Sequence, residues 1–411
     1  MTHLGLISAV AASEKKCQII CFDPDEKRIN ELLDNNFPVS EPRLQELILK
    51  NRKYLTFTYN SNLLNTCDIV YVAPDVSTDD NGQSDLRYIN NLIDLVYTFT
   101  KKDTTLVILS QVPPGFTRSK LKPGRTLLYQ VETLIFGRAI DRALYPERYI
   151  VGCDDPCQPL PLSFKKFLEL HNCPILPMRY ESAELAKISI NMCLVASVTT
   201  ANVLAEICEN IGADWSEIVP ALKLDKRIGS YAYLKPGLGI AGGNLERDLA
   251  TIINLGNLYD ADIKMVKAWL FNSLHRKSWA SKKIREILLD NNKHAKLGIL
   301  GLSYKEDTRS IKNSPSLHVI SELQEFNVSV YDPLVKWDSK WHPKAKVFES
   351  VNDLMQDIDA LLILTPWNEF REINFNTLKQ KVRSKIIIDP YSMLDRNEAL
   401  KNGLIIFTLG K

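Results

Sequence analysis

Two residues near the middle of the chain have the types and spacing of a pair that stabilises a developing negative charge. Lys187 and Asn191 lie four positions apart in a stretch, 181–210, that contains neither Gly nor Pro. On a helix this spacing places both side chains on one face. An ammonium group beside a reacting carbon stabilises an alkoxide, and an amide orients that oxygen or a water molecule. The alternative is a solvated lysine, but Leu185 and Ile188 beside it are apolar.

The elements that must position this pair alternate along both ends of the chain. In the first third, the apolar runs 17–23, 68–74 and 104–110 are typical of buried strands, and the stretches between them are typical of amphipathic helices. The same alternation resumes after residue 291. We therefore predict an α/β protein with two Rossmann-like parallel-sheet domains, joined by a long central helix over 181–210.

The beginning of the chain differs from a complete dinucleotide-binding unit, which opens with a buried strand leading into G-x-G-x-x-G. The chain opens MTHLGLISAVAAS, so Gly5 fits the third glycine and Thr2 falls on the second. Either the true start lies upstream or the N-terminal sheet lacks its first strand. Asp23 ends the next strand and suits the ribose diol of NAD. The alternative for Asp23 is a turn residue in Asp23-Pro24-Asp25.

Several segments resemble the UDP-glucose/GDP-mannose dehydrogenase family, the nucleotide-sugar 6-dehydrogenases, in the same order along nearly the whole chain. They are Phe22-Asp23, Ser40-Glu41-Pro42, Val72-Ala73-Pro74, Ser110 to Gly115, Gln130-Val131-Glu132, Glu184 to Lys187, Asp225 to Asp248, Gly301 to Lys305 and Ser314-Pro315-Ser316. The shared order carries more weight than any single motif. The resemblance implies an NAD-dependent, cytoplasmic oxidoreductase that acts on a nucleotide sugar, with UDP as the expected nucleotide, in the formation of polysaccharide precursors.

The resemblance also divides the chain into regions with expected roles. Residues 1–180 are expected to form an NAD-binding Rossmann-like domain. Residues 181–290 are expected to form a central helical and dimerisation region that includes the active-site glycine loop. Residues 291–411 are expected to form an α/β domain that binds the nucleotide sugar.

The resemblance assigns five residues to catalysis. Glu132 falls on the family's catalytic glutamate, although a glutamate at the end of a strand is otherwise a cap or a surface charge. Lys187 and Asn191 face the sugar, and Asp248 stands where the family keeps an aspartate that helps to activate water. Asn244 stands where the family has its nucleophilic cysteine. A thiolate is a strong nucleophile and a carboxamide is not, so no thiohemiacetal can form at this position.

Contacts with the cofactor and the substrate follow from the same resemblance. The residues expected to bind NAD are Gly5, Asp23, Arg28, Pro74 and Gln111. The residues expected to bind the substrate are Arg227, Tyr233, Gly239, Gly242, Gly243 and Lys305. The chain departs from the family pattern at Ser197, Lys312 and the sequence Asp389-Pro390-Tyr391, which leaves the sugar and the nucleotide open.

Three functions are consistent with these observations. The first is an active oxidoreductase that oxidises the alcohol by two electrons, or that hydrates the aldehyde for a slow second oxidation. The second is a non-catalytic relative that binds a nucleotide sugar and has a regulatory or scaffold role. The third is a dehydrogenase of the wider hydroxyacid type. Because Glu132, Lys187, Asn191 and Asp248 are all retained, we favour the first.

Composition restricts the partners. A formal net charge of +2 without blocks of like charge does not indicate a nucleic-acid partner. The eight cysteines are scattered and predict reduced thiols rather than a metal site. No continuous apolar run approaches the roughly 18 residues that span a bilayer, so no membrane partner is expected. The apolar positions of 181–210 exceed one core-facing stripe, which predicts burial on two sides. The family resemblance implies a homodimer through this helix; burial between two domains of one chain is the alternative.

Overall fold

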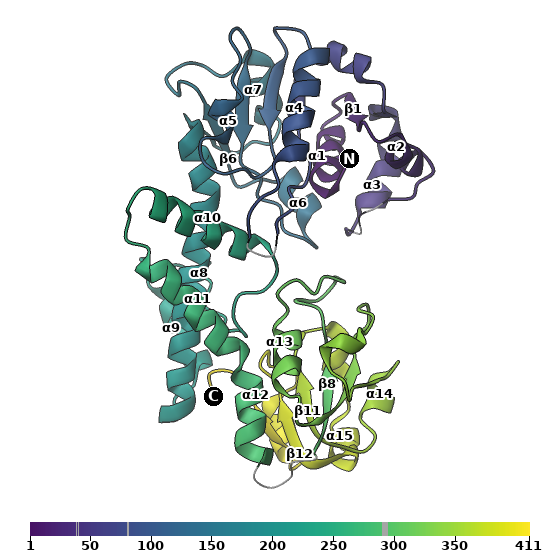
Figure 1. Ribbon diagram of the computed structural model, residues 1–411, viewed down its shortest axis with the longest axis vertical. Coiled ribbons are helices and arrows are strands. Elements are labelled where there is room, and N and C mark those ends of the chain that lie inside the picture. Colours follow the sequence, from purple (N-terminus) through teal and green to yellow (C-terminus); the bar gives the residue numbers. More distant parts are fainter. Residues whose placement is uncertain (38, 40, 80–81, 290–294) are drawn as a thin grey trace. The chain divides into compact units, whose positions relative to one another are not determined.

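The computed structural model describes residues 1–37, 39, 41–79, 82–289 and 295–411 and divides into two compact units, Met1–Ile190 and Asn191–Lys411 (Figure 1). Ser40 lies outside the described residues. Helix α8 (Tyr180–Ile211) runs uninterrupted for 32 residues and belongs to both units, which confirms the predicted central helix. The functional boundaries expected at residues 180 and 290 stay a prediction.

Unit 1, Met1–Ile190, contains two separate sheets within its described residues. Strands β1 (Ile19–Phe22) and β2 (Leu55–Thr58) form a two-stranded sheet. The second sheet has five strands in the order β3-β4-β5-β6-β7, with only the β5–β6 pair antiparallel. These strands are β3 (Ile69–Val72), β4 (Thr105–Ile108), β5 (Leu127–Gln130), β6 (Tyr149–Cys153) and β7 (Ile175–Arg179). Within the described residues no strand lies between β1 and β3, so the first strand of a dinucleotide-binding sheet is absent there.

The helices of unit 1 cover these sheets. They are α1 (His3–Glu14), α2 (Glu26–Leu33), α3 (Leu44–Lys50), α4 (Arg87–Phe99), α5 (Phe116–Ser119), α6 (Ala139–Leu144) and α7 (Leu162–Glu169). Helix α2 begins where the sequence predicts, because the Asp25 side chain accepts a hydrogen bond from the backbone N–H of Arg28. Helix α1 packs with α3, α6 and the β1–β2 ladder in one core, whereas α4 packs against β3 and β4 in another.

Unit 2, Asn191–Lys411, contains one continuous six-stranded parallel sheet in the order β10-β9-β8-β11-β12-β13. Its strands are β8 (Lys296–Leu300), β9 (Asn327–Tyr331), β10 (Lys346–Val347), β11 (Ile358–Ile363), β12 (Val382–Ile388) and β13 (Ile405–Phe407). Its sheet helices are α13 (Pro315–Glu322), α14 (Val351–Leu354), α15 (Phe375–Lys381) and α16 (Arg396–Lys401). All six residues of β11 are buried, which is typical of a strand covered on both faces.

The remaining helices of unit 2 follow α8. They are α9 (Trp215–Leu224), α10 (Asn244–Leu258), α11 (Lys264–Lys277) and α12 (Trp279–Ile284), and a π-helical turn, Arg285–Leu289, ends the series. Residues 265–289 contain neither Gly nor Pro and would suit one helix, whereas the structure breaks this stretch at Ser278. The Ser278 hydroxyl donates to Glu322 on α13, so a side-chain contact fixes this break.

The criterion of a continuous apolar run, by which no segment of the sequence could cross a membrane, was too narrow for α8. By length and average composition α8 is apolar enough to cross a membrane, although only 28% of its most apolar window is buried. Polar residues such as Ser197 and Thr199 interrupt any continuous apolar run, but the mean hydropathy over a window of residues stays high. A core or interface helix of a protein outside the membrane can have the same length and mean composition.

Candidate active site

Unit 1 holds two of the five predicted catalytic residues, Lys187 and Glu132, as a close ion pair. The Nζ of Lys187 lies 2.7 Å from Oε1 of Glu132 and donates to the Glu132 carbonyl oxygen at 3.0 Å. The second oxygen of Glu132 accepts a hydrogen bond from the N–H of Leu134 at 2.8 Å. Both side chains are largely buried, with exposed fractions of 13% and 18%. The solvated lysine considered above is therefore not observed: the ammonium is held against the end of β5.

The helical turn before Lys187 is fixed to the same sheet. Glu184 is fully buried and accepts hydrogen bonds from the N–H groups of Gly115 and Thr117, at 2.6 and 2.8 Å. Burial raises the pKa of the Glu184 carboxyl, and these backbone donors oppose that rise. Gly115 has a φ of +90°, a conformation that L side chains rarely adopt. The Pro113-Pro114-Gly115 turn thus anchors the start of α8 and, through it, Lys187.

Unit 2 holds the other three predicted catalytic residues, Asn191, Asn244 and Asp248. The Nδ2 of Asn191 donates to Oδ2 of Asp248 at 2.5 Å, and Asp248 is fully buried on α10. Arg247 Nε lies 3.4 Å from the other oxygen of Asp248. A buried carboxylate held by an amide and a guanidinium keeps a defined orientation. Asn191 is one helical turn past Lys187 on α8, as the spacing predicts.

The position of the family's cysteine differs from the expectation in one respect. Asn244 is the first residue of α10 rather than part of a loop, and its side chain is exposed. Backbone N–H groups at a helix start are favourable for anions. Glu246 in the first turn is consistent with the helix dipole. The Asn244 carboxamide is accessible there, but it cannot act as a nucleophile.

The glycines before Asn244 are required by close packing. Gly242 has a φ of +75°, and a Cβ there would lie 2.9 Å from the Tyr304 ring; its N–H donates to the Lys312 carbonyl at 3.1 Å. A Cβ at Gly239, with φ +80°, would lie 2.4 Å from the Ser273 carbonyl oxygen. The loop therefore packs against Tyr304 and Lys312, which follow β8, and against Ser273 of α11.

Three residues that the sequence analysis did not single out fasten this loop. Asn313 bonds through its side chain to the Ile240 carbonyl at 3.0 Å and also contacts Glu246 and Lys277. Lys277 is only 5% exposed. Burial lowers the pKa of Lys277 and raises that of Glu246. In the sequence, only the position of Asn313 directly before Ser314-Pro315 could have indicated this cluster. Lys277 looks like an ordinary lysine of an amphipathic stretch.

The remaining substrate-binding candidates of unit 2 are more open. The Arg227 guanidinium is 89% exposed and pairs with Asp225 at 2.7 Å, and Tyr233 is 58% exposed. This hydrogen bond from Arg227 holds the pKa of the Asp225 carboxyl below its usual range. The Lys305 ammonium lies 5.8 Å from the centre of the Tyr304 ring. Arg227 and Tyr233 thus have no buried position within unit 2.

The predicted NAD contacts of unit 1 gather at the ends of β1, β3 and β4. Asp23 is 2% exposed and accepts from Arg28 Nη1 at 2.9 Å and from the N–H of Asp25 at 3.0 Å. The Pro74 carbonyl accepts the Ser110 hydroxyl at 2.5 Å, one residue before Gln111. Asp23 follows β1 directly and accepts from Asp25, as the turn alternative expects, and its role at a ribose diol stays a prediction.

At the start of α1 the fit to a dinucleotide is incomplete. The N–H of His3 donates to Oδ2 of Asp75 at 3.1 Å, so a carboxylate lies where a helix N-terminus would bind a pyrophosphate. Gly5 leaves room on the helix, since its nearest neighbour to an added Cβ is the Ala73 carbonyl at 3.5 Å. Asp75 therefore lies at the pyrophosphate end of the expected NAD site, and at its ribose end the Asp23 carboxylate is paired with Arg28 and with the N-terminal amine of Met1.

No metal is needed to describe these groups. Among the residues that the structure describes, no cluster of three or more His, Cys, Asp or Glu side chains could hold a metal ion.

Comparison with known proteins identifies the class. Three models of the UDP-glucose/GDP-mannose dehydrogenase family match: its NAD binding domain over residues 1–159, its central domain over residues 181–272 and its UDP binding domain over residues 298–396. The chain therefore belongs to the UDP-glucose/GDP-mannose dehydrogenase family, and its cofactor is NAD.

Individual relatives agree along the whole length. The chain is 28% identical to the UDP-glucose 6-dehydrogenase of Rickettsia conorii, over 99% of this chain and 97% of the relative. It is 27% identical to UDP-glucose 6-dehydrogenase TuaD of Bacillus subtilis, over 100% and 91%. Two solved structures share the fold. A UDP-glucose dehydrogenase from Pyrobaculum islandicum has a TM-score of 0.79, 22% identity and coverage of 93% and 91%. A UDP-D-ManNAc dehydrogenase from Pyrococcus horikoshii has a TM-score of 0.84, 20% identity and coverage of 99% and 97%.

Proposed function

We propose that this protein oxidises the primary alcohol of a UDP-linked sugar with NAD and that Asn244 restricts it mainly to the first, two-electron step. The observation that carries the proposal is the retention of two tight pairs, Lys187 with Glu132 and Asn191 with Asp248, beside the loss of the nucleophile at Asn244. A scaffold would not require a buried lysine and a buried aspartate held in this way.

The first step uses the residues of α8. NAD, when bound, accepts the hydride that leaves the alcohol carbon, and the hydroxyl proton leaves with a base or water, so that the alcohol loses two electrons and becomes an aldehyde. The Lys187 ammonium stabilises the negative charge that develops on the oxygen, and Glu132 orients that ammonium. Asn191 holds the substrate oxygen or a water molecule in place.

The second oxidation is the step that Asn244 impedes. Without a thiolate the aldehyde is not trapped as a thiohemiacetal, so a second hydride can leave only from a hydrated aldehyde. Asp248 is suited to assist the addition of water, which needs no redox partner. Cys193, two residues past Asn191, is exposed, and its position on the helix places it on a different face from that residue. We therefore expect aldehyde to accumulate.

The proposed assembly is a homodimer formed through α8. Val203, Leu204, Ile207 and Ile211 form one exposed apolar stripe on its C-terminal half, with exposed fractions from 39% to 70%. Such a stripe on a helix is stabilised by burial against a partner. In a dimer the exposed Arg227 could be used by a second copy, which accounts for its lack of burial in one chain. We place this dimer in the cytoplasm and propose no nucleic-acid or membrane partner.

The test is a count of NADH produced per sugar consumed, with a panel of UDP- and GDP-sugars. We expect about one NADH per sugar, with aldehyde trapped by a hydroxylamine reagent; two per sugar, with acid as the product, would contradict the restriction at Asn244. Lys187→Met should lower kcat by at least about 100-fold with little change in sugar binding. Lys102→Met, in an exposed turn, is the matched control.

A non-catalytic role is the second candidate, because Asp75 and Thr2 lie at the start of α1 where a pyrophosphate would bind. Sugar binding by calorimetry without NADH formation for any sugar would favour it. Asn244→Cys would then discriminate further: gain of acid formation indicates that the rest of the machinery is intact.

A further inference from the structure

The middle of the glycine loop, residues 237–243, is held on both sides by residues that depend on one face of α11. The N–H of Ile240 donates to Oγ of Ser273 at 2.7 Å. The Ile240 carbonyl accepts from Nδ2 of Asn313 at 3.0 Å, and Lys277 donates to Oδ1 of the same Asn313. Ser273 and Lys277 are four positions apart on α11, so they lie on one face of this helix. That face therefore fixes the peptide groups on both sides of Ile240.

Asn313 can connect these groups in only one orientation of its amide. Its Oδ1 faces the Lys277 ammonium, which has donors and no acceptor, whereas its Nδ2 faces the Ile240 carbonyl and Oε1 of Glu246. A flipped amide would direct N–H groups at the ammonium and an oxygen at the carboxylate. The backbone of Asn313 has a φ of +54°, which asparagine tolerates better than most residues. The amide thus joins a cation, an anion and the loop in one defined arrangement.

The cation and the anion that Asn313 joins are both withdrawn from water. Lys277 is 5% exposed, and Glu246 is half-buried. Burial lowers the pKa of Lys277, and the charge of Glu246 opposes this effect. Burial raises the pKa of Glu246, and the charges of Lys277 and Lys312 oppose that rise. A buried charge that loses its counter-charge is unfavourable, so each of the two groups requires the other.

Glu246 connects this cluster to the candidate active site. It lies in the first turn of α10, two residues after Asn244 and two residues before Asp248. Helix α11 contacts both α10 and α13, and Asn313 directly precedes the start of α13 (Figure 1). The rest of the loop, including Gly242, lies between the two points that Asn313 holds. A loop fixed at two points has little conformational freedom left to lose when a ligand binds.

The residues proposed for hydride transfer depend on other contacts. Lys187 and Glu132 are held by groups of unit 1, at the end of β5. A looser glycine loop therefore leaves the ammonium beside the alcohol oxygen in place but is less often ready to bind the sugar. When the binding-competent loop is populated only in part, the apparent dissociation constant rises by the reciprocal of that fraction.

We propose that Lys277 is a positioning residue: through Asn313 and Glu246 it holds the glycine loop in the conformation that binds the sugar of a nucleotide-sugar substrate. It thereby determines substrate affinity rather than turnover. Only the part of this inference that concerns turnover rests on the proposed function. The order of the loop is a property of the free chain and is measured without substrate.

Hydrogen exchange of the free chain tests the order of the loop. In Lys277→Met the amides of Ile240 and Gly242, both hydrogen-bonded in the folded chain, should exchange at least about tenfold faster, because the loop opens more often. The buried strand β11 should keep its exchange rates. Lys267→Met, which changes an exposed lysine of the same helix, is the matched control and should behave like the unaltered chain. Unchanged exchange at both loop amides of Lys277→Met would overturn the proposal.

A double-mutant cycle tests the role of the two charges. Glu246→Gln alone leaves the Lys277 ammonium without its counter-charge and should also speed exchange of the loop. The combined Lys277→Met, Glu246→Gln chain leaves neither charge buried alone, so its effect should be smaller than the product of the two single effects. Independent effects of the two changes would contradict the proposal.

Asn313→Asp keeps the test decisive should Lys277→Met fail to fold. Aspartate has the shape of asparagine and tolerates the same backbone conformation, but it lacks the N–H donors to the Ile240 carbonyl and to Glu246. Exchange of the Gly242 amide should again be at least about tenfold faster. Exchange as slow as in the unaltered chain would show that the loop does not depend on this cluster.

Binding and turnover of UDP-glucose, used as the probe, test the effect on affinity. Calorimetry should give Lys277→Met a Kd at least about tenfold above that of the unaltered chain, while kcat for NADH formation changes less than about threefold. Lys187→Met is expected to show the opposite pattern. A fall in kcat at unchanged Kd would overturn the assignment of Lys277. Should the unaltered chain bind UDP-glucose without forming NADH, the proposed oxidation fails, and Kd and hydrogen exchange still decide the role of Lys277.

Discussion

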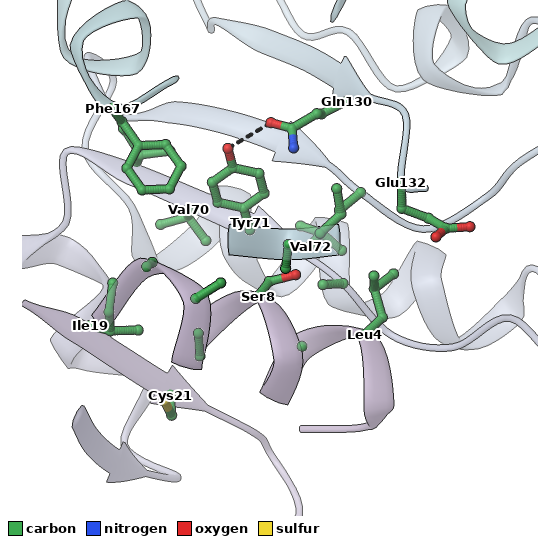
Figure 2. A pocket seen from close by; sticks show the side chains of 18 of the residues that line it. Leu4, Ser8, Ile19, Cys21, Val70, Tyr71, Val72, Gln130, Glu132 and Phe167 are labelled. Carbon is green, nitrogen blue, oxygen red and sulfur yellow. Dashed lines mark hydrogen bonds between the residues drawn. The ribbon is translucent and has the colours of Figure 1, made fainter. Parts of the chain in front are cut away.

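The sheets of the two units differ at one position, the place of the central strand. In unit 2, β8 pairs with β9 on one side and with β11 on the other, and its residues Leu297, Ile299 and Leu300 are fully buried. In unit 1 the corresponding position, between β1 and β3, is a cavity of about 740 Å³ that is lined by these two strands and α1 (Figure 2), here called the inter-sheet cavity. A central strand thus contributes two ladders and a two-sided core at once, and without it a sheet divides into two smaller cores.

The turn after the strand shows the same difference. In unit 2, β8 leads into Gly301, whose φ is +92° and where a Cβ would lie 2.4 Å from Thr365. In unit 1 the glycine near the start of α1, Gly5, has an ordinary helical conformation and space around it. A glycine is structurally required only where a strand feeds a tight turn against a neighbouring strand.

The largest expected difference between the two units comes from a proline placed in β8 and, separately, in β1. Ile299→Pro removes a donor and a fully buried side chain from β8, and we expect it to destabilise unit 2 by at least about 3 kcal/mol or to unfold it. Ile20→Pro removes a donor that faces the inter-sheet cavity and should cost unit 1 about 1 kcal/mol.

Tryptophan fluorescence separates the two units in this experiment. All six tryptophans lie in unit 2, so their emission in urea reports on that unit, while hydrogen exchange reports on unit 1. Similar losses for the two proline variants would show that β1 is paired on both sides in solution.

Replacing Gly301 and Gly5 with alanine, one at a time, tests the same difference between the two units. Gly301→Ala should destabilise unit 2 by about 2–4 kcal/mol, because both its φ and the contact with Thr365 are unfavourable for a side chain. Gly5→Ala should stabilise α1 by about 0.5–1 kcal/mol, since alanine is the better helix former and its Cβ meets no close contact. Urea midpoints measure both changes, and a loss of stability for Gly5→Ala would contradict the observed space.

The smallest effect concerns the aspartates that end a strand in each unit. Asp389 follows β12 and is fully buried; it accepts from the N–H of Leu394 at 2.9 Å, and burial raises the pKa of its carboxyl. The folded state therefore keeps its proton to higher pH than the unfolded state, and its contribution to stability is lost as pH rises through the folded pKa. Each pKa unit of difference corresponds to about 1.4 kcal/mol.

Asp389→Asn removes this dependence, so its stability relative to the unaltered chain should increase between pH 4 and pH 7. Asp23→Asn in unit 1 should instead lose about 1 kcal/mol at pH 7, because Asp23 accepts three hydrogen bonds or ion pairs, including that from Arg28. Urea titrations at several pH values measure both; parallel stability curves for Asp389→Asn and the unaltered chain would refute the role of burial.

Much of the fold followed from the pattern of apolar residues. The strands expected at 17–23, 68–74 and 104–110 appear as β1, β3 and β4, and the Gly- and Pro-free stretch appears as α8. The break at Ser278 was not predicted, because helical periodicity continues across it and only the contact with Glu322 on α13 interrupts it.

The candidate site was predictable in part. Lys187 and Asn191 could be paired by spacing alone, but their partners Glu132 and Asp248 come from distant segments. Asp75 and Lys277 gave no signal, since their significance arises from where α1 and the glycine loop place them. Short-range spacing identifies residues on one element, whereas partners across elements depend on packing.

The sequence by itself determined the class of this protein, the α/β alternation, the long helix and the exchange of the family's cysteine for Asn244. These are properties of local order: periodicity, residue type and the succession of motifs. Only the tertiary structure decided that Lys187 is held by Glu132, that a carboxylate stands at the start of α1, and that two strand edges of unit 1 face one cavity. Those results depend on burial and on contacts between residues far apart in the chain, where desolvation and backbone pairing, rather than local preference, determine which groups meet.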